Sequence, residues 1–359
     1  MIPDRTTLLR LLGSATRIPS GDNCQPWSFQ AEKDKLIILH DESRGRHALN
    51  RKNHASLISL GCLAEGLSIA SSVEGLRAEV TPLFTTEPPE LGKAWAEVRF
   101  RPSADRVNPL VVALINRCTD RSLYKGGDLC DPVFRDIASD AVPFADIEIR
   151  MISQSQYSQK FLDVACQTET CVWTDEKAQQ DLMRWIRFSD KEVQSTRDGM
   201  PWRTLGISYP ESRILKLCRS FATQQLMNKA GFLAQSRKVT RKQILSSAGI
   251  LAWVTHHPSA AALYAVGRLS FRAWLRLVKM GYAAQPMTLT SLSLYDMATG
   301  ALDPKEPAES LLKQSLPAIQ EAFSMGPNQL PVWMLRTGLS EGLPPETRCL
   351  RLPVESILS

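Results

Sequence analysis

The sequence lacks the short motifs that identify several large classes of enzyme. It contains neither a GxGxxG nor a GxxxxGK[ST] segment, so no dinucleotide-binding Rossmann turn and no nucleotide-binding P-loop is predicted. It contains no GxSxG segment, which argues against the nucleophile turn of the α/β-hydrolases. Its five histidines and eight cysteines form neither an HxxxH pair nor a CxxC pair, so no metal site is expected.

Long apolar runs are also missing. The best candidate, residues 248–266, is interrupted by His256, His257 and Pro258, so no membrane-spanning segment is predicted. The first residues contain no basic stretch followed by an apolar run, and no signal peptide is expected. Scattered cysteines without such a leader are typical of a reducing compartment, so we expect free thiols and a cytoplasmic protein.

Acidic residues are absent between Glu211 and Asp296, an interval that holds twelve Lys or Arg residues. Arg268, Arg272 and Arg276 recur every four residues, so they share one face of a predicted helix. One interpretation is a solvated basic face. The other is a wall that binds an anion, such as a cofactor phosphate, an acidic substrate, a membrane surface or a partner. The net charge of +6 is mild and does not by itself indicate nucleic acid.

The remaining composition is that of an ordinary globular chain of 359 residues, 43% apolar and 22% charged, with room for two domains or one large composite domain. Apolar spacing predicts helices over 8–15, 55–73, 109–118 and 259–279, mainly helical structure over 155–188, and a long basic helical stretch over 211–247. Strands are predicted over 28–30, 35–40, 77–84, 94–100, 249–255 and 332–337. This mixture indicates an α+β layered architecture.

A short internal echo suggests duplication. Gly61 and Gly75 have the same fourteen-residue separation as Gly267 and Gly281, and apolar positions between them match. Each unit is a helix whose end leads toward a strand. Chance produces such spacing matches often, so the echo by itself is weak.

Three segments carry groups suited to binding. The turn 19–27 offers a hydroxyl, amides and free backbone N–H groups that suit the edge of a planar heterocycle, although it also fits a structural turn with a buried tryptophan. Arg117, Thr119 and Arg121 suit a phosphate, although an exposed polar helix end has the same composition. Arg336, Arg348 and Arg351 are either further phosphate donors or surface arginines. Cys24 and Cys118 have no histidine nearby in sequence and are expected to be packed thiols.

The turn resembles the PS-x-x-N-x-QPW signature of the nitroreductase superfamily, with Pro19, Ser20, Asn23, Gln25 and Pro26 in place. Residues 117–121 resemble the basic phosphate-binding segment of that family, and residues 351–355 resemble its closing element. The signature precedes the basic segment here, an order similar to that of the twin-domain, Acg-like branch, in which one chain forms a pseudo-dimer. Cys118 departs from the family, which often has a polar residue there.

The resemblance implies an α+β nitroreductase-like fold in which half-units 1–125 and 126–359 intertwine, the second carrying a basic insert at 211–249. It implies one FMN, with NADH or NADPH as a possible electron donor, and no catalytic side chain is assigned. The implied cofactor-binding residues are Pro19, Ser20, Asn23, Gln25, Arg117, Thr119, Arg121, Gln285, Pro286, Arg348 and Arg351.

The function that follows from this resemblance is two-electron transfer through flavin N5 to or from a small or carrier-bound substrate, with anionic substrates included. Two alternatives stay open: a protein that sequesters FMN without reductase activity, and a flavin domain docked to a partner in a biosynthetic pathway. No nucleic-acid partner is expected, and a further homodimer is compatible with the sequence.

Overall fold

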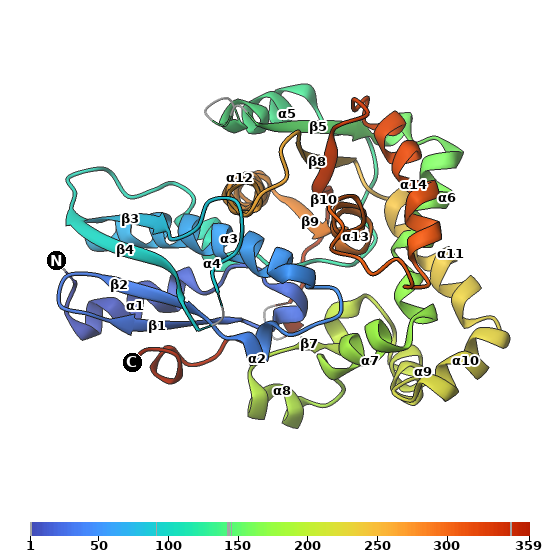
Figure 1. Ribbon diagram of the computed structural model, residues 1–359, viewed down its shortest axis with the longest axis horizontal. Coiled ribbons are helices and arrows are strands. Elements are labelled where there is room, and N and C mark those ends of the chain that lie inside the picture. The colour runs from blue at the N-terminus through green and yellow to red at the C-terminus, as the bar shows by residue number, and fades with distance from the viewer. Residues whose placement is uncertain (1, 91, 142–143, 145, 345–346) are drawn as a thin grey trace.

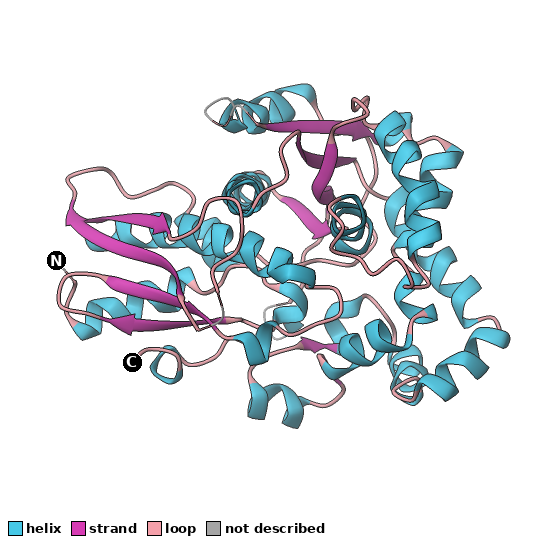
Figure 2. Cartoon of the chain, viewed as in Figure 1, coloured by secondary structure: helices cyan, strands magenta, loops and turns pink. Residues whose placement is uncertain are grey.

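Two antiparallel four-stranded sheets, each covered by helices, form the protein (Figures 1 and 2). The computed structural model describes residues 2–90, 92–141, 144, 146–344 and 347–359. The first sheet has the order β1 (Trp27–Ala31), β2 (Leu36–His40), β4 (Ala94–Pro102), β3 (Leu76–Pro82). The second has the order β5 (Ile147–Ser153), β8 (Gly249–Thr255), β10 (Leu330–Leu339), β9 (Tyr282–Pro286), and β6 (Ile186–Arg187) pairs with β7 (Met200–Pro201).

The α+β class predicted from the sequence is confirmed, with antiparallel sheets flanked by helices. The helices are α1 (Arg5–Ala15), α2 (Glu42–Gly45), α3 (His54–Ser71), α4 (Val111–Asn116), α5 (Asp131–Ala138), α6 (Gln159–Thr168), α7 (Glu176–Arg184), α8 (Asp190–Thr196), α9 (Tyr209–Leu217), α10 (Phe221–Lys229), α11 (Phe232–Leu245), α12 (Ala260–Lys279), α13 (Thr288–Ala298) and α14 (Glu309–Ala322). The basic stretch is therefore three helices. Strand β5 is not among the strands predicted from the sequence.

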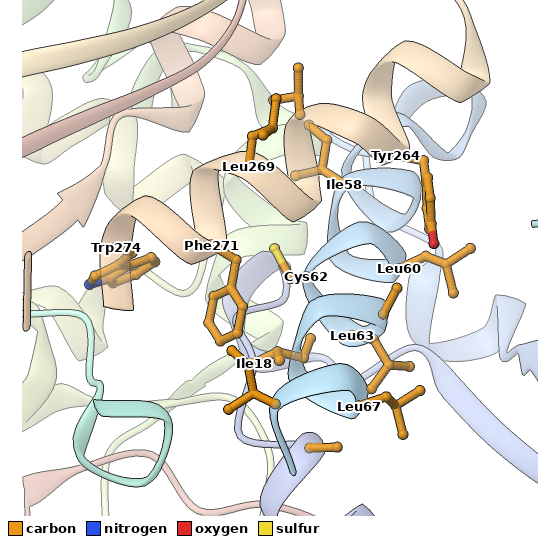
Figure 3. Close-up of a cluster of buried hydrophobic side chains, with 14 of the residues drawn as sticks. Ile18, Ile58, Leu60, Cys62, Leu63, Leu67, Tyr264, Leu269, Phe271 and Trp274 are labelled. Carbon is orange, nitrogen blue, oxygen red and sulfur yellow. The ribbon is translucent and has the colours of Figure 1, made fainter. Parts of the chain in front are cut away.

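Helices α3 and α12 cross at the centre of the molecule (Figures 1 and 3). Helix α3 packs on the first sheet and α12 on the second. Their crossing point is Gly61 against Gly267, where a methyl group on Gly61 would overlap the Tyr264 carbonyl oxygen and one on Gly267 would overlap that of Ile58. The two glycines of the sequence echo therefore permit one close backbone contact, because any side chain there would push the helices apart.

The same crossing explains why the chain contains an apolar helix that is long enough to span a bilayer. Residues 51–74 qualify by length and composition, and 83% of the apolar window is buried inside the protein. The segment is thus the central core helix, with leucine and isoleucine side chains on several faces (Figure 3).

The C-terminal tail returns to the first sheet. Residues Phe29 and Leu358 form a parallel bridge, and the Phe29 N–H donates to the Ile357 carbonyl at 2.7 Å. The Ser359 N–H donates in turn to the Phe29 carbonyl at 2.9 Å. The tail that follows β10 of the second sheet thus covers the edge of β1, which ties the two sheets together.

Candidate functional site

A cavity of about 130 Å³ lies where the early turn meets the segment after α4. Pro19 and Ser20 line it from the turn, Thr119 and Arg121 from the segment, and Pro286 from the end of β9. These residues are about 100 and 265 positions apart in the chain, so the tertiary fold alone brings them together. We call this space the first cavity.

The turn that lines the first cavity has a strained backbone. Asp22, Asn23 and Gln25 have φ values of 47°, 58° and 53°, in the left-handed region that non-glycine residues rarely adopt. Hydrogen bonds hold this shape: the Ser20 Oγ accepts from the Gln25 N–H at 3.0 Å, and the Asn23 Nδ2 donates to the Gly199 carbonyl at 2.9 Å. Such strain persists only where surrounding contacts fix it, and it concentrates at binding sites.

Asn23, Gln25 and Arg351 connect the turn to the C-terminal tail and do not line the described cavities. The Arg351 Nη1 donates to the Asn23 Oδ1 at 2.7 Å, and the Gln25 Oε1 accepts from the Leu352 N–H at 2.8 Å. Arg351 also donates to the carbonyls of residues 16, 17 and 18, just beyond the end of α1. These three side chains are hydrogen-bonded to other parts of the protein, and so they fix the turn. The bonds between the turn and the tail join residues more than 300 positions apart in the sequence.

Arg117 and Arg348 likewise lie outside the lining of the described cavities. The buried Arg117 guanidinium stacks 4.5 Å from the centre of the Trp274 ring, and its Nη2 donates to the Arg17 carbonyl at 2.9 Å. Among the residues that the structure describes, its Nε and Nη1 have no hydrogen-bond partner, and neither does the Nε of Arg348. Burial lowers the pKa of Arg117 to about 10, so the side chain still carries its charge at neutral pH.

Arg44, His47 and Trp185 also line the first cavity, and sequence reasoning missed them. Arg44 donates to the Cys24 carbonyl at 2.7 Å and pairs with Asp198 at 2.7 Å, which joins the turn to the strand pair near Gly199. No local motif marks these residues. Cys24 itself is not an activated nucleophile, since burial raises its pKa to about 12.

A larger cavity of about 520 Å³ adjoins the first one. Six lining residues are common to both: Asp22, Leu49, Arg121, Pro286, Thr288 and Leu289. Its outer wall comes from α9, α10 and α11, and the predicted site residue Gln285 lies in it. The Gln285 Oε1 accepts from the Nε of Arg336, a buried arginine that lines the same space. We call this space the second cavity.

Glu169, just after α6, is one of three carboxylates that line the second cavity. Its Oε1 accepts from the Thr290 N–H at 2.8 Å and from the Thr290 Oγ1 at 2.7 Å, in the first turn of α13. Burial raises the pKa of this carboxyl to about 7, and the bonds from Thr290 offset only part of that effect. Sequence reasoning missed Glu169 because a lone glutamate at a helix end gives no local signal.

The basic face of α12 proves to be paired within the chain. Arg268 and Arg272 bind Glu65 of α3 at 3.3 and 2.8 Å, and Arg276 binds Asp140 at 3.0 Å. The interpretation of these arginines as an anion-binding wall is therefore wrong. Their partners lie more than 130 residues away in sequence, where a scan of neighbouring charges cannot find them.

The structure shows all eight cysteines free. Within the described ranges, no group of three or more His, Cys, Asp or Glu side chains is placed to hold a metal ion.

No family model and no curated protein matches the chain. Among solved structures, it is similar to an FMN- and NADPH-dependent nitroreductase from Sphigopyxis sp. strain HMH, with 12% identity, a TM-score of 0.36, and coverage of 70% of this chain and 98% of that one. A candidate nitroreductase from Anabaena variabilis gives 10% identity, a TM-score of 0.47, and coverage of 95% of this chain and 90% of that one. An FMN-dependent nitroreductase from Clostridium difficile R20291 gives 10% identity, a TM-score of 0.36, and coverage of 68% of this chain and 96% of that one. These likenesses are distant, so the proposed function rests on the chain's own residues.

Proposed function

We propose that this protein is an FMN-dependent oxidoreductase of nitroreductase type, with the flavin in the first cavity. The proposal is supported most by two segments that are remote in sequence and line the same cavity. The turn contributes Ser20, and the segment after α4 contributes Thr119 and Arg121. These are the two segments whose sequences resemble the ring-binding and phosphate-binding elements of that family.

The lining of the first cavity suits a flat polar heterocycle. Ile58, Leu289 and Trp333 offer apolar surface to the faces of a ring. Ser20 offers a hydroxyl at the edge, and Arg121 offers a charged group for a phosphate. The first cavity is small for a whole flavin, but it is continuous with the second through the shared residues, which gives the ring system room.

When bound, FMN supplies hydride transfer at its N5 atom, with NADH or NADPH as the donor we propose. The protein's residues would hold and polarise the ring. Arg121 adds positive charge between the two cavities, and Asn23, Gln25 and Arg351 keep the turn in its strained shape. No side-chain acid or base is assigned to hydride transfer itself.

We also propose that the halves 1–125 and 126–359 act as a pseudo-dimer around a single flavin site. Each half contributes a central helix that is followed within a few residues by a left-handed glycine and then by a strand: α3, Gly75 and β3, then α12, Gly281 and β9. The pairing of the C-terminal tail with β1 supports the intertwining.

The test is the absorption spectrum and FMN affinity of the purified protein. We expect oxidised-flavin bands and stoichiometric binding of one FMN per chain. Replacing Arg121 with Gln should weaken FMN binding by about 10- to 100-fold, the value of a charged hydrogen bond. The matched control Arg237→Gln removes the same charge from the exposed side of α11 and should leave binding unchanged. A colourless protein that does not bind added FMN would refute the proposal.

Two alternatives remain distinguishable by one further measurement. A protein that only stores FMN would bind it without reduction by NADH or NADPH, whereas an oxidoreductase would reduce it. A flavin domain docked to a partner would reduce its flavin but act only on a carrier-bound substrate. The exposed basic residues of α9, α10 and α11 are the surface available for such a partner.

A further inference from the structure

The second cavity differs in character from the first. Its volume of about 520 Å³ lies within the range of sites that enclose drug-sized molecules. Most of its wall is aliphatic or aromatic, with Ile214, Met227, Phe232 and Val239 contributed by the three helices of the acid-free stretch. The Lys and Arg side chains of these helices do not line it. These helices are thus amphipathic, with basic residues outward and an apolar wall inward.

The charges around the second cavity do not favour an anion. Arg336 is already bound through all three guanidinium nitrogens, to Gln285, Gln243, Ser247 and Ser122. Arg121 donates to the Thr204 carbonyl and the Met200 sulfur, and its charge would be balanced by the phosphate of the FMN proposed for the first cavity. The carboxylates of Asp22 and Glu211 line the same space and offset the two arginines, and Glu169 adds no charge while it holds a proton. A neutral occupant fits this balance.

Glu169 provides a directed polar group in that apolar wall. Its Oε1 is fixed by Thr290. No hydrogen bond joins its Oε2 to any residue that the structure describes, and this oxygen is not fully enclosed by protein atoms. The second oxygen is therefore open to the cavity. The charged side chains that act on the Glu169 pKa are Arg336 and Arg121, which lower it, and Glu169 in turn raises the pKa of the thiols Cys166 and Cys171.

We propose that the second cavity is the substrate pocket, that it takes a neutral, largely apolar molecule of aromatic-ring size, and that Glu169 holds a proton on Oε2 and donates it in a hydrogen bond to a carbonyl-type oxygen of that molecule. This deepens the proposed function, since the substrate would lie beside the flavin of the first cavity. Arg121, Pro286 and Leu289 line both spaces, so the substrate would meet the flavin where the two cavities adjoin.

The test compares three probes by calorimetry on the full chain: 2-acetylnaphthalene, naphthalene and 2-naphthoate. At pH 6 the ketone should bind about tenfold more tightly than the hydrocarbon, because only the ketone accepts the hydrogen bond. At pH 8.5 that advantage should disappear as Glu169 loses its proton. Equal affinities at pH 6, or tighter binding of the naphthoate than of the ketone at pH 8.5, would overturn the proposal.

Two variants make the test specific. Glu169→Gln keeps a donor at every pH, so the advantage of the ketone should persist at pH 8.5; pH dependence equal to that of the wild type would place the titrating group elsewhere and overturn the role of Glu169. Val239→Trp fills the cavity from α11 and should abolish binding of both neutral probes. Unchanged binding in that variant would also overturn the proposal. If Glu169→Gln does not fold, the wild-type comparison of ketone and hydrocarbon still decides.

Flavin absorbance measured on the same samples separates the two claims. A protein that binds FMN but shows no ketone preference refutes only the substrate pocket. A protein that shows the preference without binding FMN refutes only the flavin site.

Discussion

The buried carboxyl of Glu169 should make the stability of the protein depend on pH in a defined direction. Its pKa in the folded protein is about 7, and burial is the main cause of the rise from the ordinary value of 4.5. Between those two values the folded state holds a proton that the unfolded state has lost. The free energy of unfolding should therefore fall as pH rises through this window, with the favourable contribution fully present below pH 4.5.

The size of the effect follows from the same pKa values. The difference between 4.5 and about 7, at about 1.36 kcal/mol per pKa unit, gives about 3 kcal/mol as an upper bound, since water entering the second cavity would screen the charge. Glu169→Gln removes the titration. The free energy of unfolding of the variant minus that of the wild type should then rise by up to this amount between pH 4 and pH 8.

Urea denaturation of both proteins across that range, at equal flavin content, measures this difference. Every other titrating group occurs in both proteins and cancels. A difference that stays flat across the window, or that falls with rising pH, would refute the assignment of a protonated buried carboxyl.

Three further outcomes are expected. Gly61→Ala should destabilise the protein by about 3 kcal/mol or more, because the methyl group overlaps backbone at the α3–α12 crossing. Gly13→Ala in α1 should be neutral or slightly stabilising, because its methyl group would meet the Val354 Cγ2 at an ordinary contact distance of 3.9 Å; thermal unfolding compares the two. Arg351→Met should cost about 2–4 kcal/mol in urea denaturation and loosen the turn, since it leaves the Asn23 Oδ1 and carbonyls beyond α1 unpaired; an unchanged midpoint would contradict this role. Cys24 should resist alkylation at pH 8 about 1000-fold more than an ordinary thiol, while the exposed Cys130 reacts readily, as mass mapping of iodoacetamide adducts would show.

The sequence by itself determined most of the regular structure. Apolar periodicity predicted the strand over 249–255 and the helix over 259–279, which the structure confirms as β8 and α12. Asp4 caps α1, since its side chain accepts from the Thr7 N–H, and an aspartate just before an apolar periodic run is a local signal for such a cap. Such features depend on neighbours within a few residues, so a local pattern is enough to reveal them.

The sequence also determined which segments carry binding chemistry, because a turn rich in amides and hydroxyls and a cluster of arginines are visible locally. It did not determine which of their side chains face a ligand. Ser20 and Arg121 line the cavities, whereas Asn23 and Arg351 bind each other across 328 positions of the chain. Only the folded chain decides between those roles, since the competing partner of each group is remote in sequence.

Tertiary structure alone also produced the second cavity and the environment of Glu169. The charge of the acid-free helices was compatible with a solvated basic face or with an anion-binding surface, and it gave no sign that their apolar faces turn inward to form a wall. The arginines of α12 pair with Glu65 and Asp140 from other helices or turns. Charge balance and burial are sums over residues that meet only after folding, which is why the pattern along the chain could not specify them.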